Sequence, residues 1–174
     1  MPLVPYDDPG AVSAGDPLPA AYLNTARDNG TWFDEPPQCV VYDTTVTAVA
    51  DATTVALSCT LEEYDNNTMH STTVNPSRIK AVAAGRYTLL GTANFAANAT
   101  GLRRIGIRIN GTTEYVLQRV FAGSAVTDII LSGVRTFTFA VDDYAELVVG
   151  QTSGGSLNVT PLSFEMIYTS AVPS

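Results

Sequence analysis

Two spacings of apolar residues divide the chain near position 37. Before it, Leu18, Tyr22 and Ala26 recur at every fourth position, which is typical of one apolar face of an α-helix. From Gln38 onward, apolar and polar residues alternate in short runs that are rich in threonine and valine, as in β-strands. The pattern therefore predicts a short helix within residues 1–37 and a β-rich domain over residues 38–174.

The expected helix has both a start signal and an end signal. Asp16 suits the N-cap, Pro17 suits the first helical position, and Asn29-Gly30 suits the C-terminal end. The proline-rich segment before it has no periodicity, so we expect an extended arm there. Because so short a helix is marginal on its own in water, we expect arm and helix together, residues 1–37, to dock on another surface.

Turn residues separate a series of predicted strands. These are CVVYDTTV, TTVALSCTL, RIKAV, GRYTLLGTANFAA, GLRRIGIRIN, TEYVLQRVFA, TDIILSGVRTFTFAV, DYAELVVGQTS and SLNVTPLSFEMIYTS, with TAVADA as the turn between the first two. Asn110-Gly111 is a strong hairpin signal. No interval between strands has room for a crossover helix, so the sheets are expected to be antiparallel. The predicted fold class is all-β: an antiparallel jelly-roll β-sandwich preceded by an extended N-terminal arm and one short helix.

Composition narrows the range of partners. The formal net charge is −8, and Lys80 is the only lysine. Such an acidic chain repels nucleic acid and anionic lipid, so we expect neither as a partner. The sequence has no apolar run of about 20 residues and MPLVPYDDPG lacks the regions of a signal peptide, so we expect no membrane span and synthesis in a cytoplasm. There, Cys39 and Cys59 are expected to be free and buried, although a disulfide between them remains open.

Groups suited to catalysis or metal binding are scarce. His70 is the only histidine, and no nucleophile motif surrounds it, so we interpret it as a surface-loop residue. Asp142, Asp143 and Glu146 could supply part of a calcium site, but the spaced carboxylates of a calcium loop are missing. We therefore predict no enzyme activity, no cofactor and no metal.

Three stretches resemble a known family of jelly rolls. AGRYTLLGTANF, residues 84–95, resembles the Gly-x-Tyr strand of the tumour-necrosis-factor-like and complement globular-head domains. VDDYAELVVGQTSGG, residues 141–155, resembles their Gly-Asp-x-Val-x-Leu strand, with Asp142 in place of the glycine, and PLSFEMIY resembles their closing strand. The resemblance covers about residues 38–170. It implies a homotrimer, because such jelly rolls usually form trimers.

A second resemblance concerns function. SAGDPLPAAYLNTARDNGTWF is similar to a segment near the start of many structural proteins of tailed bacteriophages. The matching positions are Gly15, Asp16, Leu18, Ala20 or Ala21, Asn24, Arg27, Asp28 and Asn29. GLRRIGIRINGTT also resembles a strand that recurs in phage jelly rolls. The resemblance implies a virion protein: a capsid decoration protein or head fibre, or else a minor tail protein.

These resemblances together imply a capsid decoration homotrimer on the virion surface, made in the host bacterial cytoplasm, with the major capsid protein as partner. The residues expected to dock on the capsid are Tyr6, Leu18, Tyr22, Leu23, Arg27, Trp32 and Phe33. The residues expected at the trimer interface are Arg103, Arg104, Arg108, Tyr115 and Phe164. Arg103 shares a strand face with Ile105, Ile107 and Ile109, and is expected to pair with Glu114 or Glu165.

Three alternatives remain open at this point. The helix with Trp32 and Phe33 could plug one end of the barrel instead of docking elsewhere. The arginine-rich strand could simply face solvent. The protein could also be a minor tail or receptor-binding module that recognises a host surface ligand through the loops YDNNTMHSTTVNPS and VGQTSGGS.

Overall fold

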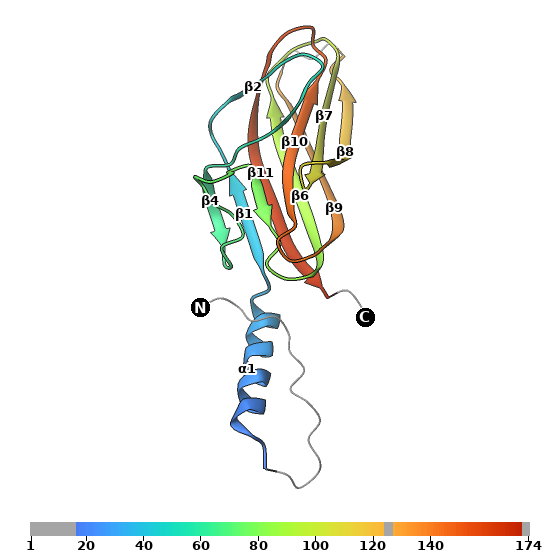
Figure 1. The fold of residues 1–174 in the computed structure, drawn as a ribbon. Coiled ribbons are helices and arrows are strands. Elements are labelled where there is room, and N and C mark those ends of the chain that lie inside the picture. Colours follow the sequence, from blue (N-terminus) through green and yellow to red (C-terminus); the bar gives the residue numbers. More distant parts are fainter. Residues whose placement is uncertain (1–16, 124–126, 172–174) are drawn as a thin grey trace.

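Two antiparallel sheets pack face to face in a sandwich, and one helix extends from its end (Figure 1). The structure is a computed structural model that describes residues 17–123 and 127–171. The elements are α1 (Ala20–Asp34), β1 (Gln38–Tyr42), β2 (Thr47–Val49), β3 (Thr54–Ala56), β4 (Leu61–Asp65), β5 (Arg78–Lys80), β6 (Gly85–Phe95), β7 (Leu102–Ile109), β8 (Thr113–Phe121), β9 (Ile129–Phe139), β10 (Tyr144–Gln151) and β11 (Leu157–Ser170). The predicted antiparallel jelly-roll sandwich with one short helix is confirmed.

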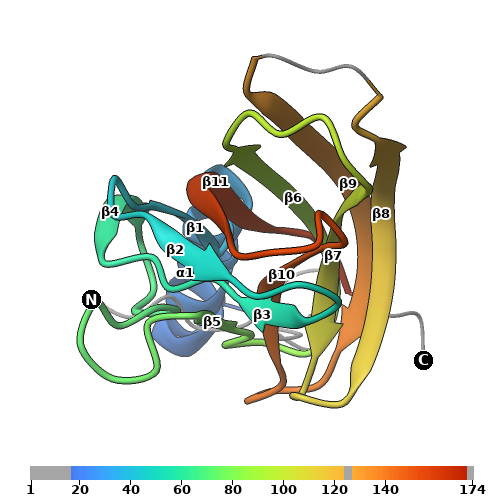
Figure 2. The same cartoon turned by 90° about the horizontal axis from the view of Figure 1, so that it is seen from above.

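The order of strands places β8 and β9 next to each other at one side of the sandwich. The first sheet has the order β4-β1-β11-β6-β9, and β2 also pairs with β11. The second sheet has the order β3-β10-β7-β8, and β5 also pairs with β10. Seen from above, β8 and β9 are the last strands of their sheets and lie side by side (Figure 2).

The core lies between the inner faces of the two sheets. Burial alternates strictly along β6, where every second residue points inward. Tyr87, Phe139 and Tyr168 meet edge to face within this core. Cys39 and Cys59 are buried and free, as expected. Burial raises the pKa of the Cys59 thiol to about 12 and raises that of Cys39 further, so both are inert as nucleophiles.

The first strand predictions need correction. TAVADA contains β2 instead of a simple turn, and TTVALSCTL contains β3 and ends at Leu61, the first residue of β4. The division arises because the chain changes sheets here: β3 pairs with β10 in the second sheet, whereas β4 pairs with β1 in the first. Leu57 and Cys59, between the two strands, are buried as the chain crosses the core.

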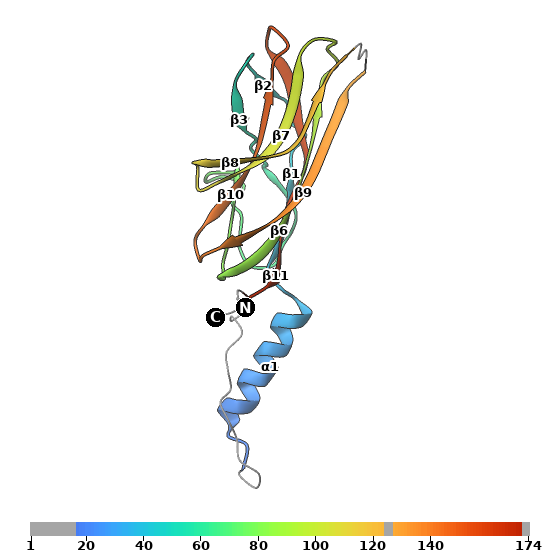
Figure 3. The same cartoon turned by 90° about the vertical axis from the view of Figure 1, so that its right-hand side faces the viewer.

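The helix also differs from its predicted bounds. It begins at Ala20 after Pro19 instead of at Pro17, and it continues through Asn29-Gly30 to Asp34, so both predicted bounds were wrong. Asp16 and the expected extended arm before it lie outside the described residues. The end signal is overridden by packing, because one further turn buries Trp32 against Tyr168, with ring centroids 5.1 Å apart. The rest of the helix extends away from the sandwich (Figure 3). No described helix is long and apolar enough to cross a membrane.

Candidate functional site

Two of the residues predicted for a trimer interface lie inside the single chain. Arg103 and Phe164 are fully buried, so neither can contact another subunit, and their assignment to an interface is corrected. Phe164 is on β11, whose inner face fills the core. Arg103 does share the inner face of β7 with the isoleucines, but that face is covered by the other sheet.

Arg103 binds backbone carbonyls instead of the predicted Glu114 or Glu165. Its guanidinium donates to the carbonyl oxygens of Thr100 at 2.8 Å, Asn98 at 3.0 Å and Leu102 at 3.1 Å. Burial lowers the pKa of this arginine. The side chain therefore holds the loop before β7 in place, and its role is structural.

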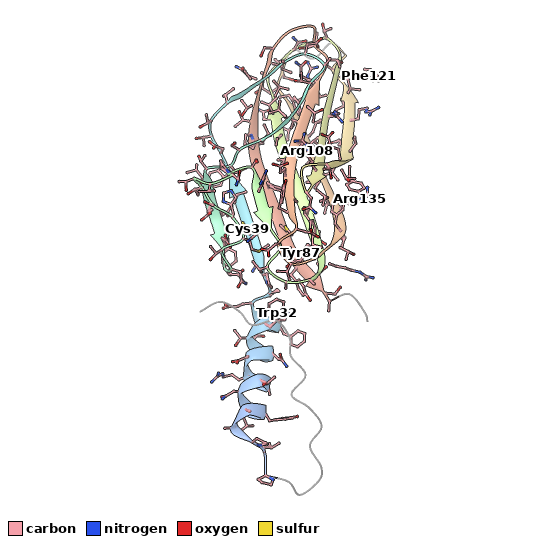
Figure 4. The ribbon with its side chains drawn as sticks, viewed as in Figure 1. Trp32, Cys39, Tyr87, Arg108, Phe121 and Arg135 are labelled. Carbon is pink, nitrogen blue, oxygen red and sulfur yellow. The ribbon has the colours of Figure 1, made fainter. Side chains whose placement is uncertain are left out.

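Arg104 and Arg108 lie on the outer face of the second sheet. Arg108 is 2.8 Å from a carboxylate oxygen of Glu114 and 3.7 Å from one of Glu146, and Arg104 is 3.4 Å from Glu114. Figure 4 labels Arg108 on this sheet. Because the arginines have carboxylate partners within the chain, the alternative of a solvated strand face fits them better than an intersubunit pair.

The carboxylates considered for calcium are engaged separately. Asp142 pairs with Lys80 at 2.9 Å, and Asp143 accepts a hydrogen bond from Asn110 at 2.8 Å. Glu146 accepts one from Ser77 at 3.0 Å. Within the described ranges, no three His, Cys, Asp or Glu side chains are grouped to hold a metal ion.

The interpretation of His70 as a surface residue is wrong. Its side chain is buried, with Nδ1 2.9 Å from an Oε1 of Glu62 and Nε2 3.1 Å from the carbonyl oxygen of Pro76. The loop folds back over β5, where His70 pairs with Ile79. A polar loop thus covers its own histidine, which local sequence could not indicate.

Exposed apolar side chains instead occur on β8 and β9, the last strands of their sheets. Phe121 on β8 is 78% exposed, and Ile130 and Val134 on β9 are 62% and 60% exposed. Val116 on β8 is also exposed. We call these strands' exposed surface the β8–β9 side. Its residues are Tyr115, Val116, Phe121, Ile130, Val134, Arg135 and Phe137. Apolar side chains are hydrated unfavourably, and exposed apolar surface is therefore typical of contact sites.

An aromatic cluster lies along the same side. Tyr115 and Phe137 have ring centroids 5.0 Å apart, and the Arg135 guanidinium carbon lies 4.5 Å from the centre of the Tyr115 ring. Phe121 and Arg135 both lie on this side of the sandwich (Figure 4). Tyrosine, phenylalanine and arginine are enriched in protein interfaces. Of the residues predicted for a trimer interface, Tyr115 is the one that belongs to this surface.

Side-chain contacts hold the two edge strands together. Gln118 accepts a hydrogen bond at 2.9 Å from the backbone N–H of Ser132 on β9. A Cβ on Gly133 would lie 2.5 Å from Cβ of Leu117, so the absence of a side chain there allows β8 and β9 to approach. The β8–β9 side is therefore a formed surface, although no further strand in the described part of the chain pairs with its edges.

The helix and Leu18, just before it, carry most of the side chains predicted to dock on the capsid. Leu18 and Leu23 are 52% and 53% exposed, and Phe33 is 70% exposed. Tyr22 is half-buried, and Arg27 pairs with Asp28 on the helix surface. Trp32 is buried, so it supports the helix and is not available for docking. Tyr6 lies outside the described residues.

The alternative in which the helix plugs one end of the barrel applies to Trp32 and not to Phe33. Trp32 packs on the end of the sandwich, whereas Phe33 remains exposed beside it. Trp32, Phe33, Pro36 and Tyr168 line an apolar cavity of about 540 Å³ at this junction. The base of the helix is thus fixed to the sandwich, and its outer turns remain uncovered.

Comparisons with known proteins bear on the fold. No protein-family model matches the chain. No curated protein matches it. Among solved structures, the globular domain of a zebrafish complement 1qA protein superposes with a TM-score of 0.56 at 12% identity, covering 78% of this chain and 99% of its own. The Eiger TNF of S. frugiperda gives 0.54 at 8% identity, with 79% and 95% covered, and murine APRIL gives 0.50 at 11%, with 72% and 98% covered.

The fold is that of the complement C1q and TNF-like globular domains. Identities this low establish the fold alone, and functions do not follow from a shared fold. The resemblance to these jelly rolls is therefore confirmed at the level of architecture.

The sequence carries a signal for the β8–β9 side that periodicity alone did not reveal. The strand TDIILSGVRTFTFAV has apolar residues at alternate positions of both kinds, with Ile129 and Leu131 on one face and Ile130 and Val134 on the other. A strand with one solvated face alternates cleanly, so apolar residues on both faces indicate a second covered face. This signal points to Ile130 and Val134.

Proposed function

We propose that this chain is a structural protein of a tailed-phage virion, a homotrimer that decorates the capsid. The observation that carries the proposal is the division of the molecule into a jelly roll and a projecting helix, with Leu23 exposed on the helix and Leu18 exposed just before it. The jelly roll is complete without that helix. The resemblance of the helical segment to the start of phage structural proteins supports the shell as the surface on which it docks.

Self-association is proposed to use the β8–β9 side. Phe121, Ile130 and Val134 supply exposed apolar area, and Arg135 stacked on Tyr115 supplies a polar group at its border. Obligate interfaces are apolar and bury about 2,000 Å² or more in total. The resemblance to TNF-like and complement globular-head jelly rolls implies three copies.

Sedimentation of a charged variant tests the proposed interface. Val134→Asp introduces a carboxylate that would be buried without a partner, so we expect the trimer to dissociate to monomer at micromolar concentration. Leu61→Asp on the distant edge strand β4 is the matched control and is expected to remain trimeric. A wild-type chain that sediments as a monomer would reject self-association.

Capsid binding is tested with a second pair of variants. Leu18→Asp combined with Leu23→Asp replaces the exposed leucines just before and on the helix while leaving Trp32 and Phe33 in place. We expect this variant to remain a folded trimer and to lose binding to isolated capsids. The Leu61→Asp chain is expected to bind as wild type does. Retained binding by the helix variant would reject the helix as the anchor.

Location of the chain in the parent virion distinguishes the two virion roles. Cryo-EM density in threefold clusters on the capsid lattice, with α1 against the shell, is the result expected for decoration. Density confined to the tail tip would instead support a minor tail or receptor-binding module. Mass action underlies the decoration role, since a protein that binds only the assembled shell stabilises that state.

A further inference from the structure

A cavity on the second sheet shares no lining residue with the β8–β9 side or with α1. It lies between the loop that connects β4 to β5 and the strands β5 and β10, and has a volume of about 430 Å³. In Figure 2 the loop is the green segment beside β5. The residues that line it are Thr68, Met69, His70, Ser71, Val74, Asn75, Arg78, Lys80, Asp142 and Tyr144. This volume lies within the range of small-molecule sites, roughly 300–1,000 Å³.

The loop over the cavity is held in one conformation. The carboxylate of Asp65 accepts hydrogen bonds from the backbone N–H groups of Asn67 at 3.1 Å, Met69 at 3.0 Å and His70 at 2.9 Å. The buried His70 ring ties the loop to Glu62 and to the carbonyl of Pro76. A loop fixed this firmly loses little entropy when a ligand binds.

One strained residue lines the same cavity. Thr68, Asn75 and Asp142 line it with φ values of +56°, +52° and +71°. Asparagine and aspartate adopt this left-handed conformation readily, whereas it is costly for the β-branched Thr68. Such strain persists where the surrounding structure imposes it, and it occurs often at binding sites.

The wall of the cavity carries fixed cations. The guanidinium carbon of Arg78 lies 4.2 Å from the centre of the Tyr144 ring, and its Nε lies 3.5 Å from Oε1 of Glu146. Neither Nη group of Arg78 donates a hydrogen bond within the described part of the chain. Lys80 is half-exposed at the rim, where it pairs with Asp142. Each cation therefore has one carboxylate partner, and Arg78 shares Glu146 with Arg108.

The loop contributes both apolar side chains, Met69 and Val74, and neutral polar ones to the lining. Thr68, Ser71 and Asn75 offer hydroxyl and amide groups, which pair with the hydroxyls of a ligand. An apolar ligand would leave these groups unpaired, and a bare inorganic anion would leave much of the volume unfilled. The lining thus matches a compact ligand with many hydroxyls and one carboxylate.

We propose that this cavity binds an acidic monosaccharide, with Arg78 and Lys80 taking its carboxylate and the loop taking its hydroxyls. The site is independent of the proposed virion role, because it uses neither the β8–β9 side nor the helix. The geometry assigns Arg78 as the principal contact, since a guanidinium held by an aromatic ring pairs with a carboxylate through two parallel hydrogen bonds.

An NMR titration of the full-length ¹⁵N-labelled protein tests the proposal, with D-glucuronate as the probe and D-glucose as its neutral counterpart. Glucuronate is expected to shift the amide signals of residues 68–75 and to saturate at millimolar concentration. Glucose is expected to bind at least roughly tenfold more weakly, because it lacks the charge-assisted pair. Absence of a saturable shift with glucuronate would overturn the proposal.

Two variants and two further anions sharpen the test. Lys80→Gln leaves the loop intact and is expected to weaken glucuronate binding roughly tenfold. Arg86→Gln, an exposed cation on β6 of the other sheet, is expected to have no effect. Equal loss in both variants would show general electrostatic attraction and overturn the site. Acetate or phosphate binding as tightly as glucuronate would overturn the assignment to a sugar.

Discussion

Arg103 shows at the scale of one residue how a charge can become part of a core. Its guanidinium is buried and donates to three carbonyl oxygens of the loop before β7. We expect Arg103→Ala to lower the free energy of unfolding by about 2–4 kcal/mol, because it leaves those carbonyls unpaired. Arg103→Lys should recover little of this, since lysine lacks the planar fork.

Urea denaturation of both variants measures the effect, and sedimentation provides the contrast. Both variants are expected to keep the oligomeric state of the wild type wherever they remain folded. If the oligomer dissociates in these variants while the free energy of unfolding is unchanged, Arg103 would belong to a subunit interface.

Asp43 supplies a dependence of stability on pH. Burial alone would raise the pKa of its carboxyl, but hydrogen bonds from Thr45 and Thr60 outweigh burial and lower it from 3.8 to about 2. A lowered folded pKa means that the stabilisation is present above pH 4 and is lost as the pH falls toward 2. The contribution is about 2 kcal/mol at neutral pH.

Urea midpoints measured between pH 5 and pH 2.5 check this expectation. Asp43→Asn is expected to be less stable at pH 5 and to show a flatter dependence below pH 4. An unchanged slope in the variant would assign the acid sensitivity to other carboxylates.

Gly133 sets the distance between two elements, β8 and β9. A methyl group at this position would meet Cβ of Leu117 at 2.5 Å, so the strands would have to separate. We expect Gly133→Ala to lower the free energy of unfolding by about 1–3 kcal/mol. Gly155→Ala is the matched control, because a Cβ there meets nothing within 4 Å, and thermal denaturation of the pair gives the comparison.

The junction between α1 and the sandwich depends on one of two adjacent aromatic residues. Trp32 is buried against Tyr168, whereas Phe33 is 70% exposed. We expect Trp32→Ala to lower the free energy of unfolding by about 3 kcal/mol and Phe33→Ala to change it by less than about 1 kcal/mol. Chemical denaturation measures both, and equal effects would contradict a helix attached through Trp32.

At the scale of the whole molecule, self-association makes the stability of the fold depend on protein concentration. If the β8–β9 side joins copies of the chain, dilution favours the unfolded state by mass action. A roughly hundredfold increase in protein concentration is expected to raise the melting temperature of the wild type by a few degrees. The Val134→Asp chain is expected to melt at the same temperature throughout, and a concentration-independent wild type would contradict assembly.

The period of the apolar residues was enough to predict the fold class. Alternation along β6 and the helical spacing in α1 depend only on local backbone geometry, so they are visible in any window of the sequence. The turn at Asn110-Gly111 is equally local, and β7 and β8 do form a hairpin around it. The short, closely spaced strands likewise implied antiparallel pairing.

The surroundings of each strand face were decided by the tertiary structure. Arg103 and Phe164 satisfy the same alternation whether the opposite layer is their own second sheet or another subunit, so period alone could not separate the two. The continuation of α1 past Gly30, the burial of His70 under its own loop and the exposure of Val134 likewise follow from contacts between distant segments. Local sequence determines which residues share a face, and the packing of one sheet or loop on another determines whether that face meets protein or water.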